Sequence, residues 1–131
     1  AFLGVTMVAQ PADGIRVEYN LKDIGGPSAG LMFSLAVVDK LSPGELSGGE
    51  FVAGTGTIAS DGTVGPIGGI THKISAAKNA GASVFLVPAG NCSEASSADS
   101  GDMTLLEVDT LDGAVDALTA HNKGEDVETC G

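Results

Sequence analysis

Two short segments hold the residues that could do chemistry, and the first surrounds one serine with very small side chains. In Gly26-Pro-Ser-Ala-Gly30, Ser28 lies between Pro27 and Ala29, directly before a long apolar run. Small neighbours would leave room for an extended peptide, and Pro27 would fix the approach of the chain to the serine. A helix starting here would direct N–H groups and partial positive charge at an alkoxide or an oxyanion. Taken alone, the segment fits either a nucleophile or an ordinary turn.

The second segment, residues 65–77, places a lysine at the start of a predicted helix with apolar neighbours. Lys73 lies between Ile70 and Ile74 in a chain that has only six basic residues. Burial disfavours the ammonium form and lowers the pKa of a lysine, and a neutral amine can accept the proton of a nearby serine. On the other interpretation, Lys73 lies at the edge of an amphipathic helix and extends its amine into solvent.

The serine segment also satisfies G-x-S-x-G, the pattern of the nucleophile elbow in esterases with a Ser-His-acid triad. That triad needs an acid and then a histidine after the serine, and only His72 and His121 follow Ser28. The chain is short for the broad parallel sheet of such an esterase. An esterase-like hydrolase and a catalytically inactive interaction domain, in which the glycines only permit tight turns, are therefore kept as alternatives.

The sequence predicts neither a cofactor nor a metal. The glycine-rich segment lacks the Lys-Ser/Thr ending of a phosphate-binding loop, so nucleotide binding is not expected. Cys92 and Cys130 lack C-x-x-C spacing, and the two histidines are single and far apart. From the residues alone, the two cysteines are either free thiols or one disulfide.

Composition indicates one domain, residues 1–131, with a sizeable core. The chain has 131 residues, of which 43% are hydrophobic, and a formal net charge of −11. So acidic a chain is not expected to bind nucleic acid, because such binding depends on lysine and arginine neutralising phosphates. No apolar stretch approaches the ~20 residues that cross a bilayer. The start at Ala1, without a leader, suggests a piece of a longer protein.

The elements that must position Ser28 and Lys73 follow from hydrophobic periodicity and turn residues. The expected fold class is α+β, or mixed α/β, with two β-hairpins, a helix that carries the serine at its start and a helix that carries the lysine. We expect residues 91–102 to form a loop or a short helix. The predicted strands are 2–9, 15–21, 51–59, 63–67, 82–88 and 103–108, and the predicted helices are 27–41, 71–80 and one that includes 111–118.

Together the two segments resemble the proteolytic domain of Lon proteases. In that family the nucleophilic serine stands in P-S-A-G at a helix start, and the base is the lysine of a G-G-[IL]-x-x-K pattern. Here residues 26–30 and 68–73 match, with Lys73 45 positions after Ser28. Between them, residues 54–58 and 61–67 resemble the family's T-G-x-[IL] strand and its glycine hairpin. The resemblance is continuous over residues 15–88.

The resemblance implies a serine endopeptidase that acts on polypeptides through an acyl-enzyme and needs no cofactor. Ser28 would be the nucleophile and Lys73 the base, with Thr55 bonded to the lysine. Gly26, Pro27 and Ala29 would form the oxyanion and substrate-backbone region. The chain has Gly25 and Thr57 where many members have acidic residues, so the role of those two positions is left open.

The sequence of residues 24–35, 38–49 and 54–58 is most similar to the corresponding segments of the bacterial peptidases that combine a PDZ domain with a Lon domain. That resemblance implies an ATP-independent enzyme of the cell envelope, on the extracytoplasmic side, with a membrane anchor and a PDZ domain upstream. It also implies a homo-oligomer, a hexamer by analogy with the family. An oxidising compartment leads us to expect a disulfide between Cys92 and Cys130.

Overall fold

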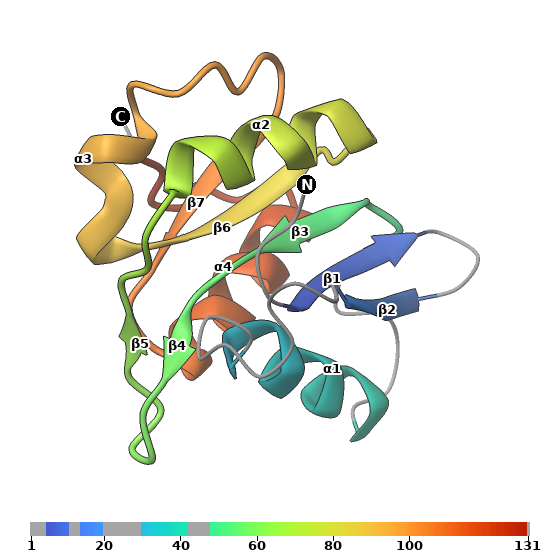
Figure 1. The fold of residues 1–131 in the computed structure, drawn as a ribbon. Helices are drawn as coiled ribbons and strands as arrows, with labels where there is room; N and C mark the ends of the chain where they lie inside the picture. The colour runs from blue at the N-terminus through green and yellow to red at the C-terminus, as the bar shows by residue number, and fades with distance from the viewer. Residues whose placement is uncertain (1–4, 11–13, 20–29, 42–47, 131) are drawn as a thin grey trace.

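A three-stranded parallel sheet forms the frame of the computed structural model, which describes residues 5–10, 14–19, 30–41 and 48–130. The strands lie in the order β3-β6-β7, with bounds Val52–Gly54, Val84–Pro88 and Thr104–Val108 (Figure 1). In the middle strand, Phe85 is opposite Ala53 on one side and Leu105 on the other. All five residues of β6 are buried, as the almost wholly apolar segment predicts.

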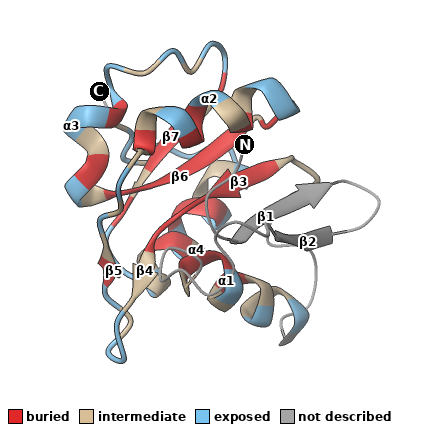
Figure 2. Ribbon diagram, in the orientation of Figure 1, coloured by how far each residue is buried: buried red, intermediate tan, exposed pale blue. Residues whose placement is uncertain are grey.

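Successive residues of β6 face two separate apolar cores, because side chains alternate across a strand. Val84 and Leu86 belong to one core, whereas Phe85 and Val87 belong to the other. Figure 2 shows the sheet buried between helices whose outer faces are exposed. The sheet is therefore covered on both faces.

Two helices cover each face. On the first face, α1 (Gly30–Leu41) and α4 (Leu111–Asn122) bury side chains that include Leu31, Leu35 and Leu118. On the second face, α2 (Ile70–Ala80) and α3 (Cys92–Ala95) contribute Ile70, Ile74 and Ala95. A short 3-10 turn, η2 (Ala89–Asn91), connects β6 to α3.

Two antiparallel hairpins accompany the sheet. β1 (Val5–Gln10) pairs with β2 (Gly14–Tyr19), and β1 lies beside β3 (Figure 1). β4 (Thr57–Ile58) pairs with β5 (Val64–Gly65). The turn of this second hairpin is closed by Asp61, whose Oδ1 accepts the N–H of Thr63 at 3.0 Å, and by Gly62 at φ 89°. Asp-Gly therefore has the turn role that its backbone preferences predict.

The mixed α+β class expected from the sequence is confirmed, but one predicted strand is wrong. Residues 51–59 form two strands in different sheets, because β3 stays with β6 while β4 turns away to pair with β5. Thr55 and Gly56 make the break. A side chain at Gly56 would come within 2.9 Å of Val64 Cγ1 and 3.4 Å of Leu31 Cβ, so the break depends on contacts distant in sequence.

Within the described ranges, none of the helices has the length and apolar character needed to cross a lipid bilayer.

Candidate active site

The predicted site residues divide into those that the structure describes and those that it does not. Lys73 and Thr55 are described. Ser28, together with Gly26, Pro27 and Ala29, lies outside the described residues, as does Gly25. The site is therefore built from the first turn of α2, the break between β3 and β4, and the first turn of α1.

Lys73 is buried in the first turn of α2, with only 8% of its surface exposed. Its backbone N–H donates to the carbonyl of Gly69 at 3.1 Å, and Gly69 precedes the helix in the left-handed conformation at φ 70°. Ile70 and Ile74 on the same helix are fully buried and hold it against the sheet. Of the two interpretations of Lys73, a buried amine or a side chain extended into solvent, the structure therefore supports burial.

Thr55 occupies the break directly after β3 and is 4% exposed. Its backbone N–H donates to the carbonyl of Leu86 on β6, with an N–O distance of 3.4 Å. The middle strand thus holds the threonine at the carboxyl end of the sheet, where binding sites of open parallel sheets are formed.

The first turn of α1 is fastened to the same break. The N–H of Leu31 donates to the carbonyl of Gly56 at 3.0 Å. Gly30, the last residue of the serine motif, lies so close to Ile58 that a Cβ would be 2.9 Å from its backbone nitrogen. A glycine is needed here because the helix start and β4 approach so closely. These contacts bring the end of the serine motif to the segment that holds Thr55.

Both α1 and α2 begin on the side of the molecule where β3 and β6 end (Figure 1). A helix start presents N–H groups without an intrahelical partner and a partial positive charge. The described part of the site therefore combines a buried amine, a buried threonine and two helix starts. Such groups can accept a proton and stabilise a developing oxyanion.

The histidines do not support the esterase alternative. His72 is exposed on α2, and His121 Nε2 pairs with Glu50 Oε2 at 2.7 Å. Glu50 precedes β3, whereas the first turn of α1 is bonded to Gly56 beyond the other end of that strand. The histidine–acid pair and the start of α1 thus belong to opposite ends of β3.

Asn91, which the sequence did not single out, binds the segment that precedes the lysine helix α2. Asn91 is 5% exposed and makes two hydrogen bonds to the backbone of Ile67, which precedes α2. Asn91 lies in a segment expected only to be a loop or a short helix, and its partner is 24 residues away. No local sequence signal marks such a pairing.

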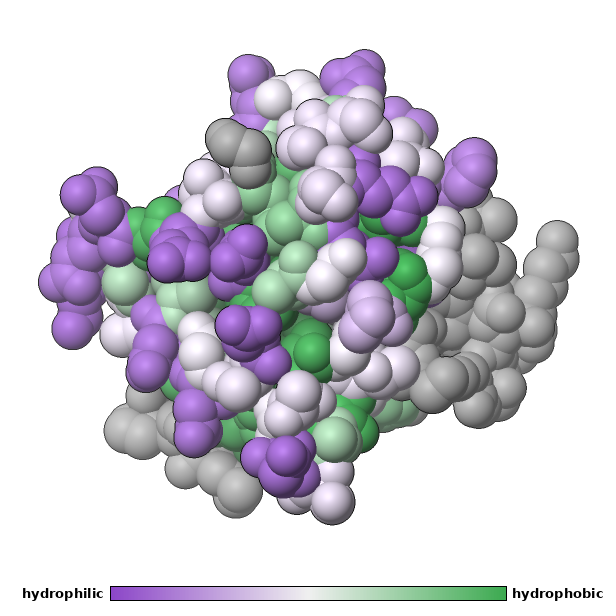
Figure 3. All heavy atoms as spheres, turned by 90° about the vertical axis from the view of Figure 1, so that its left-hand side faces the viewer, coloured by the Kyte–Doolittle hydropathy of each residue, from purple (hydrophilic) through white to green (hydrophobic). Residues whose placement is uncertain are grey.

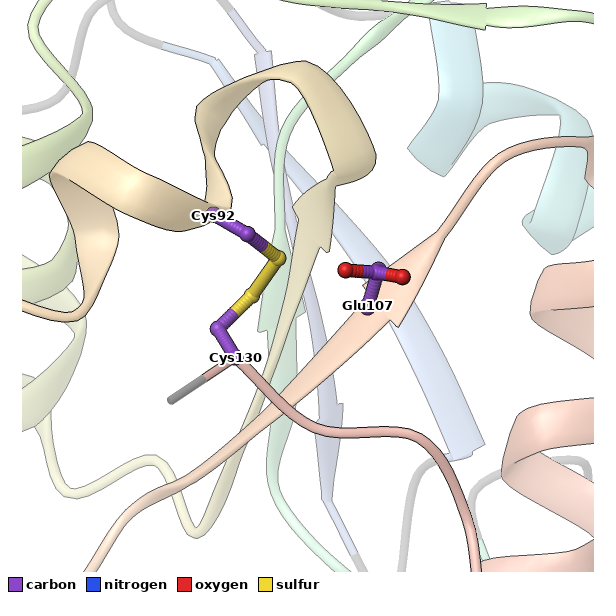
Figure 4. A group of neighbouring side chains, drawn as sticks. All are labelled: Cys92, Glu107 and Cys130. Carbon is purple, nitrogen blue, oxygen red and sulfur yellow. A yellow bond between two sulfur atoms is a disulfide. The ribbon is translucent and has the colours of Figure 1, made fainter.

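The expected disulfide between Cys92 and Cys130 is present, with Cα atoms 5.1 Å apart. It joins the start of α3 to the C-terminal tail, and Figure 4 shows Glu107 of β7 beside it. The tail also bonds to β7, because Cys130 N–H donates to Leu105 at 3.0 Å and Glu107 N–H donates to Glu128 at 3.1 Å. The tail therefore continues the sheet beyond β7.

The surroundings of the Glu107 carboxyl raise its pKa. Withdrawal from water raises its pKa, and a hydrogen bond to Glu128, together with the charges of Glu128 and Asp109, raises it further. Glu107 and the two cysteines are close enough to share an ion. The two cysteine sulfurs are bonded to each other and offer no thiolate, so this cluster is not a metal site.

The face that carries α3 and the β4–β5 hairpin is mixed in character. Figure 3 shows hydrophilic side chains dispersed among neutral and apolar ones, with no single apolar area dominating the view.

A hollow of about 340 Å³ lies elsewhere, between α4, β7 and the tail, and its lining includes Glu107, Asp116 and Asp126. This hollow belongs to the tail region and contains neither Lys73 nor Thr55.

Comparison with known proteins gives one consistent relationship. The family model of the Lon protease (S16) C-terminal proteolytic domain matches residues 21–120. Lon protease 1 of Sorangium cellulosum (strain So ce56) is 39% identical over 93 residues, which are 69% of this chain and 11% of that protein. The Lon protease of Campylobacter concisus (strain 13826) is 34% identical over 91 residues, 66% of this chain and 11% of that protein.

An archaeon also has a relative of the same kind. The archaeal Lon protease of Halobacterium salinarum (strain ATCC 700922 / JCM 11081 / NRC-1) is 35% identical over 68 residues, which are 52% of this chain and 9% of that protein. In all three comparisons the matched segment spans about a tenth of the relative's length.

Proposed function

The chain belongs to the family of Lon protease (S16) C-terminal proteolytic domains, and from this premise we propose that residues 1–131 are a serine endopeptidase domain with a Ser28–Lys73 dyad. Ser28 Oγ attacks the carbonyl carbon of the peptide bond while the neutral amine of Lys73 accepts its proton. Lys73 then returns the proton to the leaving amine as the C–N bond breaks. Water hydrolyses the acyl-enzyme, with the same amine as base.

The burial of Lys73 is the observation that carries this proposal. Taking an ammonium out of water is costly, and the partial positive charge of a helix start adds to the cost. Lys73 is 8% exposed and lies in the first turn of α2. Both features favour the neutral amine, which is the form that a general base requires. Thr55, buried at the end of β3, is assigned to orient that amine through its hydroxyl.

The fastening of α1 supports the assignment of Ser28. Leu31 is bonded to Gly56, and Gly30 packs on Ile58, so the residues that follow the serine motif are fixed against the segment of Thr55. A serine placed just before this helix would have the N–H groups of the first turn beside it. Gly26, Pro27 and Ala29 would then shape the oxyanion and substrate-backbone region.

The subtype is part of the proposal. We infer an ATP-independent peptidase of the bacterial cell envelope, with a PDZ domain and a membrane anchor upstream and a hexameric assembly by analogy with the family. The disulfide supports an extracytoplasmic location, because such bonds persist in oxidising compartments. The absence of a Lys-Ser/Thr ending after the glycines of residues 25–30 supports independence from nucleotide within this chain.

Active-site labelling tests the proposal. A fluorophosphonate probe should form an adduct on Ser28, located by mass spectrometry, and Ser28→Ala should abolish both the adduct and peptide cleavage. Ser60→Ala, the same change at an exposed serine of the β4–β5 turn, is the matched control and should behave as the wild type. A folded wild-type protein that neither reacts with the probe nor cleaves peptides would contradict the proposal in favour of the inactive interaction domain.

A further inference from the structure

The segment before α2 is held by a side chain rather than by a strand. Asn91 Oδ1 accepts the N–H of Ile67 at 2.9 Å, and Asn91 Nδ2 donates to the carbonyl of the same residue, also at 2.9 Å. One amide side chain therefore satisfies both backbone groups of Ile67, as a neighbouring strand would. The chain is also close at the preceding residue, because a Cβ on Gly90 would lie 3.2 Å from Pro66 Cβ.

Both bonds require an amide in one orientation. An amide side chain offers an acceptor to the N–H of Ile67 and, on a separate atom, a donor to its carbonyl. Asn91 is 5% exposed, so losing the two bonds would leave its buried amide without these partners. An aspartate would keep the bond to the N–H but would place a carboxylate oxygen against the carbonyl.

The backbone that Asn91 holds lies shortly before the helix that carries Lys73. Gly69, the residue before α2, makes no side-chain cap, so the direction of the helix start is set by the preceding backbone. Ile67 is two residues before Gly69, and the carbonyl of Gly69 accepts the N–H of Lys73 at 3.1 Å. Two residues of backbone, Gly68 and Gly69, thus separate the clamped Ile67 from the helix that carries the lysine.

The same region of the chain also fixes the threonine. Thr55 donates its N–H to Leu86 of β6, and Asn91 is the third residue after β6. One continuous segment, residues 86–91, therefore holds Thr55 at one point and the approach to α2 at another. We propose that Asn91 is a positioning residue, which sets the position of Lys73 relative to Thr55 and the serine. This inference rests on the proposed peptidase function.

The test compares the same substitution at two asparagines. Asn91→Ala removes the clamp, whereas Asn79→Ala changes an exposed residue of α2. At the proposed site a displacement of about 1 Å can cost a factor of about 100 in rate. We expect folded Asn91→Ala to lose roughly 10- to 100-fold in kcat, with KM within about twofold of the wild type. The titration midpoint of the Lys73 side chain, followed by NMR in labelled protein, should also shift. Asn79→Ala should change none of these.

A second variant and a second readout keep the inference open to refutation. If Asn91→Ala does not fold, Asn91→Asp is measured instead, at pH values above the pKa of the new carboxyl. It should show the same loss of kcat and a shift in the titration midpoint of Lys73. A wild-type protein without peptidase activity would end the proposed function, but the Lys73 titration and the hydrogen exchange of the Ile67 amide would still be measured. An unchanged Lys73 titration midpoint in a folded Asn91 variant would overturn the inference, whatever the wild-type activity.

Discussion

Two regions of the molecule change the surroundings of an ionisable side chain, and they do so by different means. Lys73 is held in the first turn of α2 by a backbone hydrogen bond to Gly69 and by close packing. Glu107 lies at the outer strand β7, under a tail that the disulfide joins covalently to α3. Unusual surroundings of a charge therefore do not by themselves mark a catalytic site. The lysine is set apart because it is the more deeply buried of the two and lies in the first turn of a helix.

The largest expected effect is on the lysine. Lys73→Arg keeps a long cationic side chain, but a guanidinium stays protonated at any usable pH and cannot act as the base. We expect peptide turnover to fall by a factor of about 1,000 or more, since activating a nucleophile and transferring its proton are both lost. Turnover by the wild type should rise with pH until the amine is neutral. The assay is cleavage of a fluorogenic peptide across a pH series.

The control for this change lies on the same helix. Lys78 pairs with Asp99 at 2.8 Å, at an exposed position. Lys78→Arg should therefore leave turnover and its pH dependence unchanged. Near-normal turnover by folded Lys73→Arg would contradict the dyad.

The next effect belongs to the tail region and should change stability without changing chemistry. Cys92→Ser combined with Cys130→Ser opens a loop with a sequence separation of 38. Chain-entropy reasoning gives a loss of unfolding free energy of about 4 kcal/mol. Denaturant unfolding measures it, and turnover at a temperature where both proteins are folded should stay within a few-fold. A large loss of turnover with little loss of stability would show that the two regions are coupled.

The smallest effect is the pH dependence caused by Glu107. Its pKa is raised in the folded protein, so the folded state binds the proton more tightly than the unfolded state. Stability should therefore fall as pH rises from the ordinary value near 4.5 through the raised pKa. Glu107→Gln should remove this loss and stabilise the protein at neutral pH by a few tenths of a kcal/mol, as is typical of partly exposed charges.

Thermal unfolding at pH 4 and pH 7 checks the Glu107 prediction. The difference between Glu107→Gln and the wild type should be present at pH 7 and shrink at pH 4. Glu125→Gln, at an exposed position of the tail, is the matched control. A gain of equal size at both pH values would exclude the proposed electrostatic origin.

Local pattern predicted the parts of the fold that local physics decides. The apolar run of residues 82–88 predicted a strand buried on both faces, which is β6. The predicted end of the lysine helix at residue 80 is also observed, and Gly81 follows it in the left-handed conformation at φ 97°. Burial of Lys73 was one of two interpretations, because periodicity places the residue at the edge of the apolar stripe without fixing its depth.

Features that depend on distant partners could not be predicted. The break at Thr55 and Gly56 exists because Leu31 and Val64 approach Gly56 from elsewhere in the chain, so the segment appeared to be one strand. The clamp of Asn91 on Ile67 also needs the finished fold. In both cases, a polar or small residue acquires its role only from a neighbour more than a few positions away.

The most direct test of the central claim is the structure of the protein with a peptidyl-boronate inhibitor. The account predicts a covalent bond between boron and Ser28 Oγ, with Lys73 Nζ within about 3.2 Å of that oxygen, the reach of a general base. The Thr55 hydroxyl should contact the same amine. Boron bonded elsewhere, or Lys73 turned away from Ser28 toward solvent, would contradict the account.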